Sequence, residues 1–245
     1  MIRGWSAIYY REMLILRHRL ARLIAAWSVS PLLYLVAFGY AMGKGITIQG
    51  HTYIEFLIPG LAAMVSMTQS FAIGSEINIA RFYWHVFEEF QAAPISNVAF
   101  VLGEVLAGMT RALLAGCVIL VLGASFGVVL SYSILFWSAF LLNSLIFSSL
   151  AVGLAMLIKS HADQAMLTSF VITPMAFLGG TFFPIEHLPF WAQKILCWLP
   201  LTHAANAIRA SSFNEAPQFS DYLILVSLGI LAFVFAVMTV TRARD

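Results

Sequence analysis

Long apolar stretches alternate with short polar segments along most of this chain. Residues 23–43, 56–75, 164–185 and 222–241 lack any charged or histidine side chain, and so does the longer stretch 112–158. A helix that crosses a bilayer needs about 20 consecutive apolar residues, so the longest stretch exceeds the length of one crossing. The pattern predicts an all-α integral membrane protein.

The expected number of transmembrane helices is six. They are expected at residues 23–43, 56–76, 98–122, 133–158, 164–183 and 222–241. The stretch 112–158 is expected to divide at residues 123–127, where two glycines and other small residues weaken a continuous helix. A single transmembrane domain over residues 1–245 accounts for the whole sequence.

Two charged residues, Glu104 and Arg111, lie inside the expected span 98–122. They are about two helical turns apart, so both lie on roughly one face of the helix. Charges within a membrane usually face the interior of a helix bundle and mark a pathway. The alternative is a structural role, in which the two side chains pair or reach the membrane surface.

Composition agrees with a membrane protein and narrows the function classes. The chain is 61% hydrophobic and 10% charged, whereas soluble domains contain about 25% charged residues. The net charge of +2 provides no broad basic field for nucleic acid. The two cysteines form no C-x-x-C or Cys/His cluster, so neither a metal site nor a disulfide framework is indicated.

The distribution of lysine and arginine predicts the orientation. With both termini in the cytoplasm, the inside segments contain most of the basic residues: Arg3, Arg11, Arg17, Arg19, Arg22, Arg81, Lys159, Arg242 and Arg244. The outside loops then contain only Lys44, Lys194 and Arg209. This arrangement satisfies the positive-inside rule, and the reverse orientation violates it.

Residues 1–22 have the pattern of an amphipathic helix at the cytoplasmic membrane surface. Apolar residues such as Trp5 recur at three- and four-residue spacings, while Arg11 and Arg17 take part of the opposite face. Such helices lie in the interface with aromatic rings at headgroup depth. The segment is expected to anchor the topology, and a further role in shaping a docking surface is the alternative.

The cytoplasmic loop 76–97 combines aromatic and acidic residues. Ile79, Phe82, Tyr83, Val86, Phe87 and Phe90 recur at helical spacing, with Glu88 and Glu89 at the edge of this face. Pro94 disfavours helical geometry in the residue before it. The pattern predicts a short helix that contacts a partner, although a plain interfacial connector would have a similar pattern.

The segment between the last two expected spans is too apolar for a solvated loop. Pro184, Pro189 and Pro200 divide it into pieces too short to cross a bilayer. Such pieces are typical of re-entrant or interfacial helices, which are tolerated only against protein or a water-lined cavity. Residues 184–216 are therefore expected to form an external re-entrant region.

Three stretches resemble a known family. Residues 85–96 (His-Val-Phe-Glu-Glu-Phe-Gln-Ala-Ala-Pro-Ile-Ser) are similar to Gly-Thr-Leu-Glu-x-Leu-x-x-x-Pro-x-Ser in the permease subunits of exporter-type ATP-binding-cassette transporters. Residues 200–209 resemble the family's Pro-Leu-Thr-His...Arg stretch, and residues 179–184 resemble the end of its fifth span. His85-Val86 replaces the family's Gly-Thr, which puts the turn before the helix in doubt.

The resemblance implies a mechanism and a set of partners. Members of this family export polysaccharides, lipo-oligosaccharides and hydrophobic drugs, and they sit in the bacterial inner membrane. A second permease copy, either the same chain or a sibling, would complete the pathway, and two separate ATPase subunits would bind ATP and Mg²⁺. The sequence itself contains no Gly-x-x-x-x-Gly-Lys-Ser/Thr phosphate loop. No cofactor and no enzymatic activity are therefore expected in this chain.

The candidate functional residues fall into four groups. The expected ATPase-coupling residues are Phe87, Glu88, Glu89, Phe90 and Pro94; those of the interfacial helix are Trp5, Arg11 and Arg17; those of the translocation pathway are Tyr34, Phe38, Met67, Phe71 and Phe177; and those of an external gate are Phe183, Pro184, Pro200, His203 and Arg209. Aromatic and methionine side chains form adaptable apolar surface, which suits an amphiphilic substrate beside membrane lipid.

Two other function classes remain as alternatives. A channel or ion-coupled secondary transporter usually places several acidic groups at mid-membrane, and only Glu104 is a candidate here. A membrane-embedded enzyme would need its acid–base residues to converge. The expected topology instead separates His85 and His161 on the inside from His187 and His203 on the outside.

Overall fold

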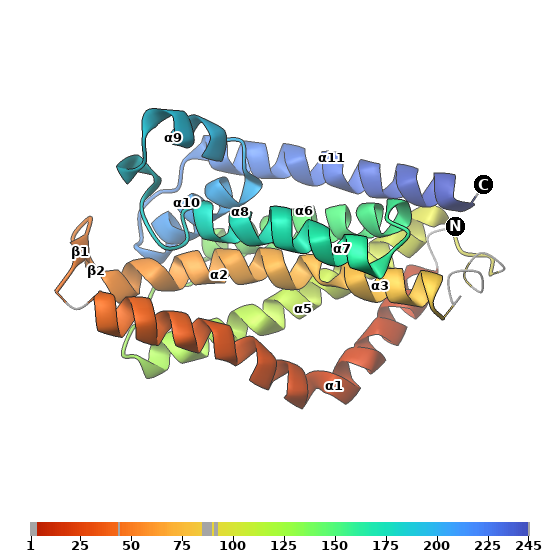
Figure 1. Cartoon of the computed structure of the whole chain (residues 1–245), viewed down its shortest axis with the longest axis horizontal. Coiled ribbons are helices and arrows are strands. Elements are labelled where there is room, and N and C mark those ends of the chain that lie inside the picture. The colour runs from red at the N-terminus through yellow and green to blue at the C-terminus, as the bar shows by residue number, and fades with distance from the viewer. Residues whose placement is uncertain (1–3, 44, 85–89, 91–92, 245) are drawn as a thin grey trace.

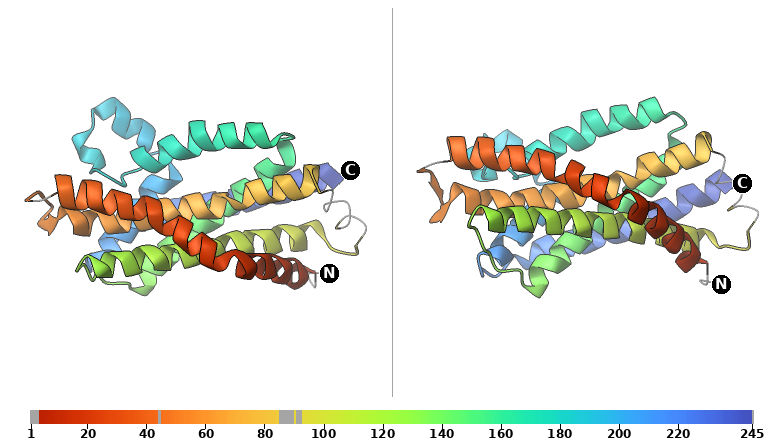
Figure 2. Two further views of the ribbon diagram at one scale, coloured as in Figure 1. Left: turned by 60° about the horizontal axis from the view of Figure 1, so that its bottom comes forward. Right: turned by 90° about the horizontal axis from the view of Figure 1, so that it is seen from below.

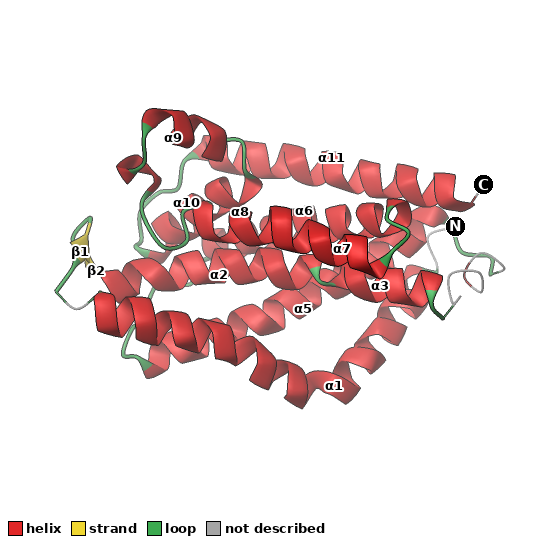
Figure 3. Ribbon diagram, in the orientation of Figure 1, coloured by secondary structure: helices red, strands yellow, loops and turns green. Residues whose placement is uncertain are grey.

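The computed structural model describes residues 4–43, 45–84, 90 and 93–244, and most of them are helical (Figure 3). In chain order the elements are α1 (Trp5–Tyr34), the π-helical segment η1 (Leu35–Met42), β1 (Thr47–Ile48), β2 (His51–Thr52), α2 (Tyr53–Phe71), α3 (Ile73–Phe82), α5 (Asn97–Ser125), α6 (Ile134–Leu157), α7 (His161–Leu167), the π-helical segment η2 (Thr168–Ile172), α8 (Thr173–Leu178), the 3₁₀ helix η3 (Ile185–His187), α9 (Phe190–Leu196), α10 (Pro200–Ser212) and α11 (Phe219–Arg244).

The long helices lie side by side and extend between two ends of the molecule (Figures 1 and 2). We call the end near both chain termini the terminal end. The opposite end, which carries the antiparallel β1–β2 hairpin, α9 and α10, we call the hairpin end. The segments α7, η2 and α8 follow one another as a bent helix that runs from the terminal end toward the hairpin end (Figure 2).

Helices α2 and α6 form the centre of the bundle. Helix α6 packs against α2, α3, α5, α10 and α11, and most of α2 is buried by its neighbours. Inside this apolar core, the Asn143 amide donates hydrogen bonds to the Ala63 carbonyl at 3.2 Å and to the Ser66 hydroxyl at 2.6 Å. Polar side chains that bond across helices in this way stabilise packing where water is absent.

Among the described residues, five helices are long and apolar enough to cross a membrane: Trp5–Ala41, Tyr53–Phe82, Asn97–Ser125, Ile134–Leu157 and Phe219–Ala243. The expected division of the stretch 112–158 is confirmed. Helix α5 ends at Ser125, Gly127 follows with a φ of 82° that suits glycine, and the Ser133 hydroxyl caps the start of α6. The bent helix of α7, η2 and α8 covers most of the expected span 164–183, but it ends earlier, at Leu178.

The beginning of the chain differs from the expected pair of separate helices. Helix α1 runs from Trp5 to Tyr34 and continues through η1 to Met42, so no break separates an interfacial helix from a first span. The helix changes direction along its length (Figure 1). Leucine and arginine, which are frequent in this segment, are among the strongest helix formers after alanine. No glycine or proline lies between Trp5 and Pro31 to end the helix.

The second span is also longer than expected. Helix α3 follows α2 almost directly and continues to Phe82, so residues 76–82 belong to a long helix and not to a loop. Its polar side chains find partners in the last turn of α6 and directly after it. Asn78 donates to the Ile158 carbonyl at 2.7 Å, and Arg81 donates to the Met156 carbonyl at 2.6 Å. These bonds give partners to polar side chains on the part of the helix that lies beyond the expected end at residue 76.

Candidate functional site

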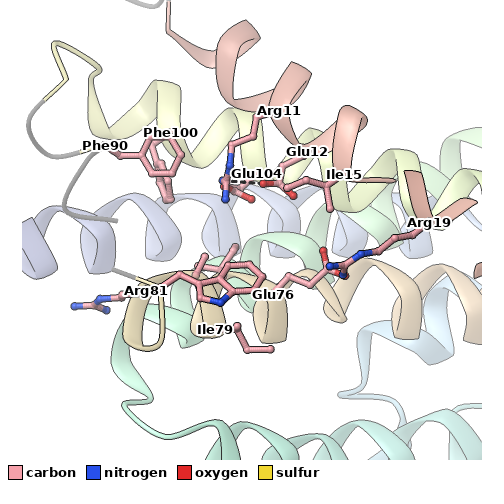
Figure 4. Close-up of a pocket in the computed structure, with 13 residues that line it drawn as sticks. Arg11, Glu12, Ile15, Arg19, Glu76, Ile79, Arg81, Phe90, Phe100 and Glu104 are labelled. Atoms are coloured by element: carbon pink, nitrogen blue, oxygen red, sulfur yellow. Dashed lines mark hydrogen bonds and ion pairs between the residues drawn. The ribbon is translucent and has the colours of Figure 1, made fainter. Parts of the chain in front are cut away.

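A pocket with a volume of about 180 Å³ opens at the terminal end between α1, α3 and α5 (Figure 4). Its lining is charged and apolar in similar measure: Arg11, Glu12, Ile15, Arg19, Glu76, Ile77, Ile79, Ala80, Arg81, Trp84, Phe90, Phe100 and Glu104. We call it the terminal pocket. It adjoins the loop for which the sequence predicted contact with a partner.

Close packing between α1 and α5 builds one wall of this pocket. Gly103 allows this approach, because a Cβ at that position would lie 2.8 Å from the Ile8 side chain. The Tyr9 hydroxyl lies 3.0 Å from the hydroxyl of Thr110, which is about two turns further along α5. Small residues permit such close helix crossings in membranes, so the start of α1 is held against the bundle.

Among the described residues, the ion pairs of the pocket do not join the two charged residues of α5 to each other. Arg111 bonds to Glu76 of α3, and not to Glu104. Arg11 donates to the neighbouring Glu12 at 2.9 Å. Glu104 is 2% exposed, and its Oε2 has no hydrogen-bond partner among the described residues. The expectation that Glu104 faces the bundle interior is therefore confirmed. A pair of Glu104 with Arg111, one form of the structural alternative, is not seen among the described residues.

The expected coupling residues fall only partly within the described chain. Phe87, Glu88 and Glu89 lie outside it. Phe90 packs on Phe100 with ring centres 5.6 Å apart, and the Arg11 guanidinium lies 5.1 Å from the centre of the Phe90 ring. Pro94 is exposed in the turn before α5.

The three residues expected on the interfacial helix all lie on α1, but their surroundings differ. Trp5 is half-buried and packs beside Tyr9, with ring centres 6.4 Å apart. Arg11 turns into the terminal pocket (Figure 4). Arg17 is exposed. Arg11 thus contacts other residues inside the protein, whereas the sequence pattern predicted a position at the membrane surface.

At the hairpin end, Arg209 is the most deeply buried of the expected gate residues that carry charge. It is 8% exposed, and its Nη2 donates to the Gly180 carbonyl at 2.6 Å. Pro184 is buried beside the same turn, and Phe183 is half-buried. Helix α10 thus ties the chain after α8 to the body of the bundle.

His203 connects different elements from those that Arg209 connects. It lies in the first turns of α10, which begins at Pro200. Its Nδ1 is 2.7 Å from Oδ1 of Asp221, in the first turn of α11, and its Nε2 is 2.9 Å from the Cys197 carbonyl. The hydrogen bond with Asp221 raises the pKa of His203, the Cys197 carbonyl adds to this shift, and burial opposes it.

The expected pathway residues separate into two groups. Tyr34, Phe38 and Phe177 surround Phe182, with ring centres 5.1 Å, 5.2 Å and 5.1 Å from its own. We call these four residues the aromatic cluster. Met67 and Phe71, in contrast, are buried on α2 in the core of the single chain.

Several residues that organise these sites were missed by the sequence analysis. Glu12 is 7% exposed within α1, Glu76 is the partner of Arg111, Phe182 is the centre of the aromatic cluster, and Asp221 holds His203. Glu12 carried a usable signal, since it is the single acidic residue among the arginines of residues 1–22. The others acquire their roles only from contacts between distant segments.

Comparison with known proteins adds an independent observation. Residues 3–213 match the family described as ABC-2 type transporter. The inner membrane transport permease YadH of Escherichia coli strain K12 is 26% identical over 236 residues, which are 93% of this chain and 92% of that protein. Nodulation protein J of Rhizobium meliloti strain 1021 is 32% identical over 209 residues, 84% of this chain and 80% of that protein.

Proposed function

This chain belongs to the ABC-2 type transporter family, and we propose that it is the membrane-spanning subunit of an exporter driven by separate ATPase subunits. The family match over residues 3–213 is the observation that carries this proposal. The absence of a phosphate loop from the sequence supports a division of labour: the partner ATPases bind ATP and Mg²⁺, and this chain forms the path.

The proposed topology has six crossings with both termini in the cytoplasm of a bacterium. The five long helices and the bent helix of α7, η2 and α8 make up the six. The position of both termini at one end of the bundle supports an even number (Figure 1). The excess of lysine and arginine at the terminal end supports its cytoplasmic location, and the hairpin end then faces outward. The relative named an inner membrane transport permease supports the inner membrane as the location.

In this arrangement the terminal pocket lies next to the coupling loop. Arg11 of α1 touches Phe90, which itself packs on Phe100 of α5. A movement of the loop by a docked ATPase would therefore reach α1 and α5 together. Phe87, Glu88 and Glu89 are the proposed docking residues, and two copies of the chain, each with one ATPase subunit, complete the exporter.

The proposed substrate is an amphiphile with an apolar tail, such as a lipid-linked glycan, a lipo-oligosaccharide or a hydrophobic drug. The aromatic cluster supports this class, because Phe177 is 38% exposed beside the exposed Phe170 and Val171 on the same bent helix. Such rings and aliphatic side chains offer adaptable apolar contact and no charge. The external gate residues around α10 lie at the hairpin end, where the tail would leave the protein.

One experiment tests the energy coupling. The permease is reconstituted with its partner ATPase in vesicles, and ATP turnover is measured for the wild type and for the double variant Glu88→Lys, Glu89→Lys. We expect the permease to stimulate turnover and the double variant to lose this stimulation, because two positive charges replace two negative ones at the docking helix. Glu215→Lys, an exposed change at the hairpin end, serves as the control. Unchanged turnover in the double variant would contradict the proposal.

Ion-coupled transport is a second candidate, favoured by one observation. Glu104 is a buried carboxylate with an oxygen that has no partner among the described residues, and such groups mark proton or ion pathways in other transporters. Glu104→Gln separates the two functions. Transport that depends on ATP alone continues in this variant, whereas transport driven by an ion gradient stops.

A further inference from the structure

The hydrogen bonds of His203 define its protonation state. One ring nitrogen is 2.7 Å from a carboxylate oxygen of Asp221, and the other is 2.9 Å from the Cys197 carbonyl oxygen. A carbonyl oxygen and an ionised carboxylate can only accept hydrogen bonds, and a neutral imidazole has only one N–H to donate. Both bonds exist together only when the ring carries two protons and a positive charge.

These two bonds join three segments of the hairpin end. Cys197 directly follows the last residue of α9, His203 lies near the start of α10, and Asp221 lies in the first turn of α11. The acidic side chain also suits the positive end of the α11 helix dipole. The side chain of His203 is 13% exposed and that of Asp221 is 8% exposed, so water competes little for these bonds.

Other charged groups around α10 do not replace Asp221. Helix α10 packs against α2, α6 and α11. On α2, Glu55 is bonded to Thr52; α6 has no ionisable residue; and on α11 the Tyr222 hydroxyl donates to the Leu135 carbonyl. On the segments that flank α10, Lys194, Glu186 and Glu215 are exposed, and Arg209 of α10 itself bonds to Gly180. Among the described residues, Asp221 is the one charged side chain that shifts the pKa of His203.

The attachment of α9 to the bundle depends on the hydrogen bond between His203 and the Cys197 carbonyl. Phe190, Trp191, Ile195 and Trp198 on and beside it are between 59% and 86% exposed, and Leu196 is the large apolar side chain of α9 that is buried. Gln193 bonds back only to the preceding turn, at Glu186 and Leu188. In the part of the chain that the structure describes, His203 provides the side-chain hydrogen bond that reaches the end of α9 from the bundle.

We propose that His203 is a proton-operated clamp that holds α9 against α10 and α11 while its ring is protonated and releases α9 when the ring is neutral. The remaining proton of a neutral ring stays on Nδ1, because a hydrogen bond to a carboxylate is stronger than one to a carbonyl. The lone pair of Nε2 then faces the lone pairs of the Cys197 carbonyl, and this repulsion separates the end of α9 from α10.

The clamp has a consequence for export that rests on the proposed function. If the hairpin end faces outward, the proton concentration outside the cell sets the position of α9. The direction follows from the raised pKa of His203: the clamp is fully formed below the usual pKa of histidine, near 6.5, and is lost as the pH rises through the higher value of the folded state. Acid outside therefore closes this end, and neutral to alkaline conditions open it.

Two measurements on the full chain in lipid nanodiscs test the clamp. The first is the ¹⁵N chemical shift of the His203 ring, assigned by its loss in His203→Gln. We expect both nitrogens to be protonated at pH 6 and Nδ1 alone to remain protonated at high pH. A neutral ring at pH 6 would overturn the proposal, and this measurement on the wild type does not depend on how well a variant folds.

The second measurement is hydrogen–deuterium exchange of α9, corrected for the intrinsic pH dependence of amide exchange. In the wild type we expect exchange to become about tenfold faster as the ring loses its proton, which corresponds to the loss of one hydrogen bond to a charged group. His203→Gln should exchange fast at every pH, while His187→Gln, an exposed histidine at the same end, should behave as the wild type. The same pH profile in His203→Gln would refute the clamp. Neither measurement uses an ATPase or a substrate. The clamp can therefore fail while the proposed export function stands, and the export function can fail while the clamp stands.

Discussion

The guanidinium carbon of Arg209 lies 3.9 Å from the centre of the Phe56 ring, so a buried positive charge of α10 rests on the face of an aromatic ring of α2. The same guanidinium donates to the Gly180 carbonyl. Arginine suits this position because its planar group is weakly hydrated and can stack and donate at once. One side chain thereby joins α2, α10 and the turn after α8.

Replacing Arg209 by lysine should destabilise the protein although it preserves the charge. The ammonium group of Arg209→Lys cannot stack flat on Phe56 while it donates to Gly180, so the variant loses most of a desolvated cation–π contact and a charged hydrogen bond, about 2 kcal/mol in the free energy of unfolding. The measurement is thermal unfolding in detergent. Arg17→Lys on the exposed part of α1 is the control, and equal melting temperatures for the two variants would show that stacking contributes nothing.

A second prediction concerns Gly60, which lies on α2 beneath the turn that follows α8. A Cβ at this position would lie 2.4 Å from the Thr181 carbonyl oxygen and 3.0 Å from its Cα. These are backbone atoms, which cannot rotate away as a side chain can, so Gly60→Ala should displace the turn that Arg209 holds.

Gly229→Ala is the matched control for this change. A Cβ at Gly229 of α11 would meet side-chain atoms, the flexible end of Leu145 at 3.3 Å and Ile146 at 3.8 Å. We expect Gly60→Ala to lower the melting temperature by several degrees and Gly229→Ala to leave it nearly unchanged, since overpacking costs about 1–3 kcal/mol. A Gly60→Ala variant as stable as Gly229→Ala would mean that the turn is not held closely against α2.

The sequence predicted the apolar helices well because each one is defined by a local property. The long uncharged stretches and the glycines at residues 123–127 located α5, α6 and α11 within a few residues. The helix of the second span continues past its expected end at residue 76, which was set by the first charge after the uncharged stretch, Glu76. Asn78 and Arg81 lie on this continuation. Their carbonyl partners, at Ile158 and Met156, are far away in the sequence.

The candidate sites were less predictable for the same reason. His203 and Arg209 were among the expected gate residues, but no pattern in the sequence identifies Asp221 or Gly180 as their partners. Arg111 was likewise placed on the correct face of α5, while its partner proved to be Glu76 on another helix. Pairing between helices depends on their packing, which hydrophobic periodicity does not encode.

Because Arg111 pairs with Glu76, substitutions of Glu76 and Glu104 should have different effects on stability. Glu76→Gln should reduce stability because it leaves the largely buried Arg111 without its ionic partner. The expected loss is about 1 kcal/mol, since the Glu76 side chain is 37% exposed and partly screened. Glu104→Gln should be neutral or stabilising, because it removes the cost of burying a carboxylate oxygen that has no partner among the described residues.

Chemical or thermal unfolding of the two variants, side by side, measures this difference. The charge-reversed double variant Glu76→Arg, Arg111→Glu should recover part of the stability that either single reversal loses. If Glu104→Gln were the more damaging of the two glutamine variants, the pairing of Arg111 with Glu76 would not be the dominant interaction of these three charged residues.

The last prediction concerns Phe182, the centre of the aromatic cluster. It is 6% exposed, contacts Tyr34, Phe38 and Phe177, and its own carbonyl accepts a hydrogen bond from the Tyr53 hydroxyl at 2.7 Å. Truncation of a buried phenylalanine to alanine typically costs about 3–5 kcal/mol. Phe182→Ala should therefore loosen α1 and η1 from α8, whereas Phe182→Leu should keep most of the contact.

Hydrogen–deuterium exchange of η1 and α8 distinguishes this local loosening from general unfolding. In Phe182→Ala we expect faster exchange in these two segments and unchanged protection in α5 and α6, which have their own core contacts. Phe219→Ala is the control, because Phe219 is 81% exposed and its loss removes little packing. Protection of η1 and α8 that survives in Phe182→Ala would show that the remaining rings, Tyr34, Phe38 and Phe177, hold the cluster together without its centre.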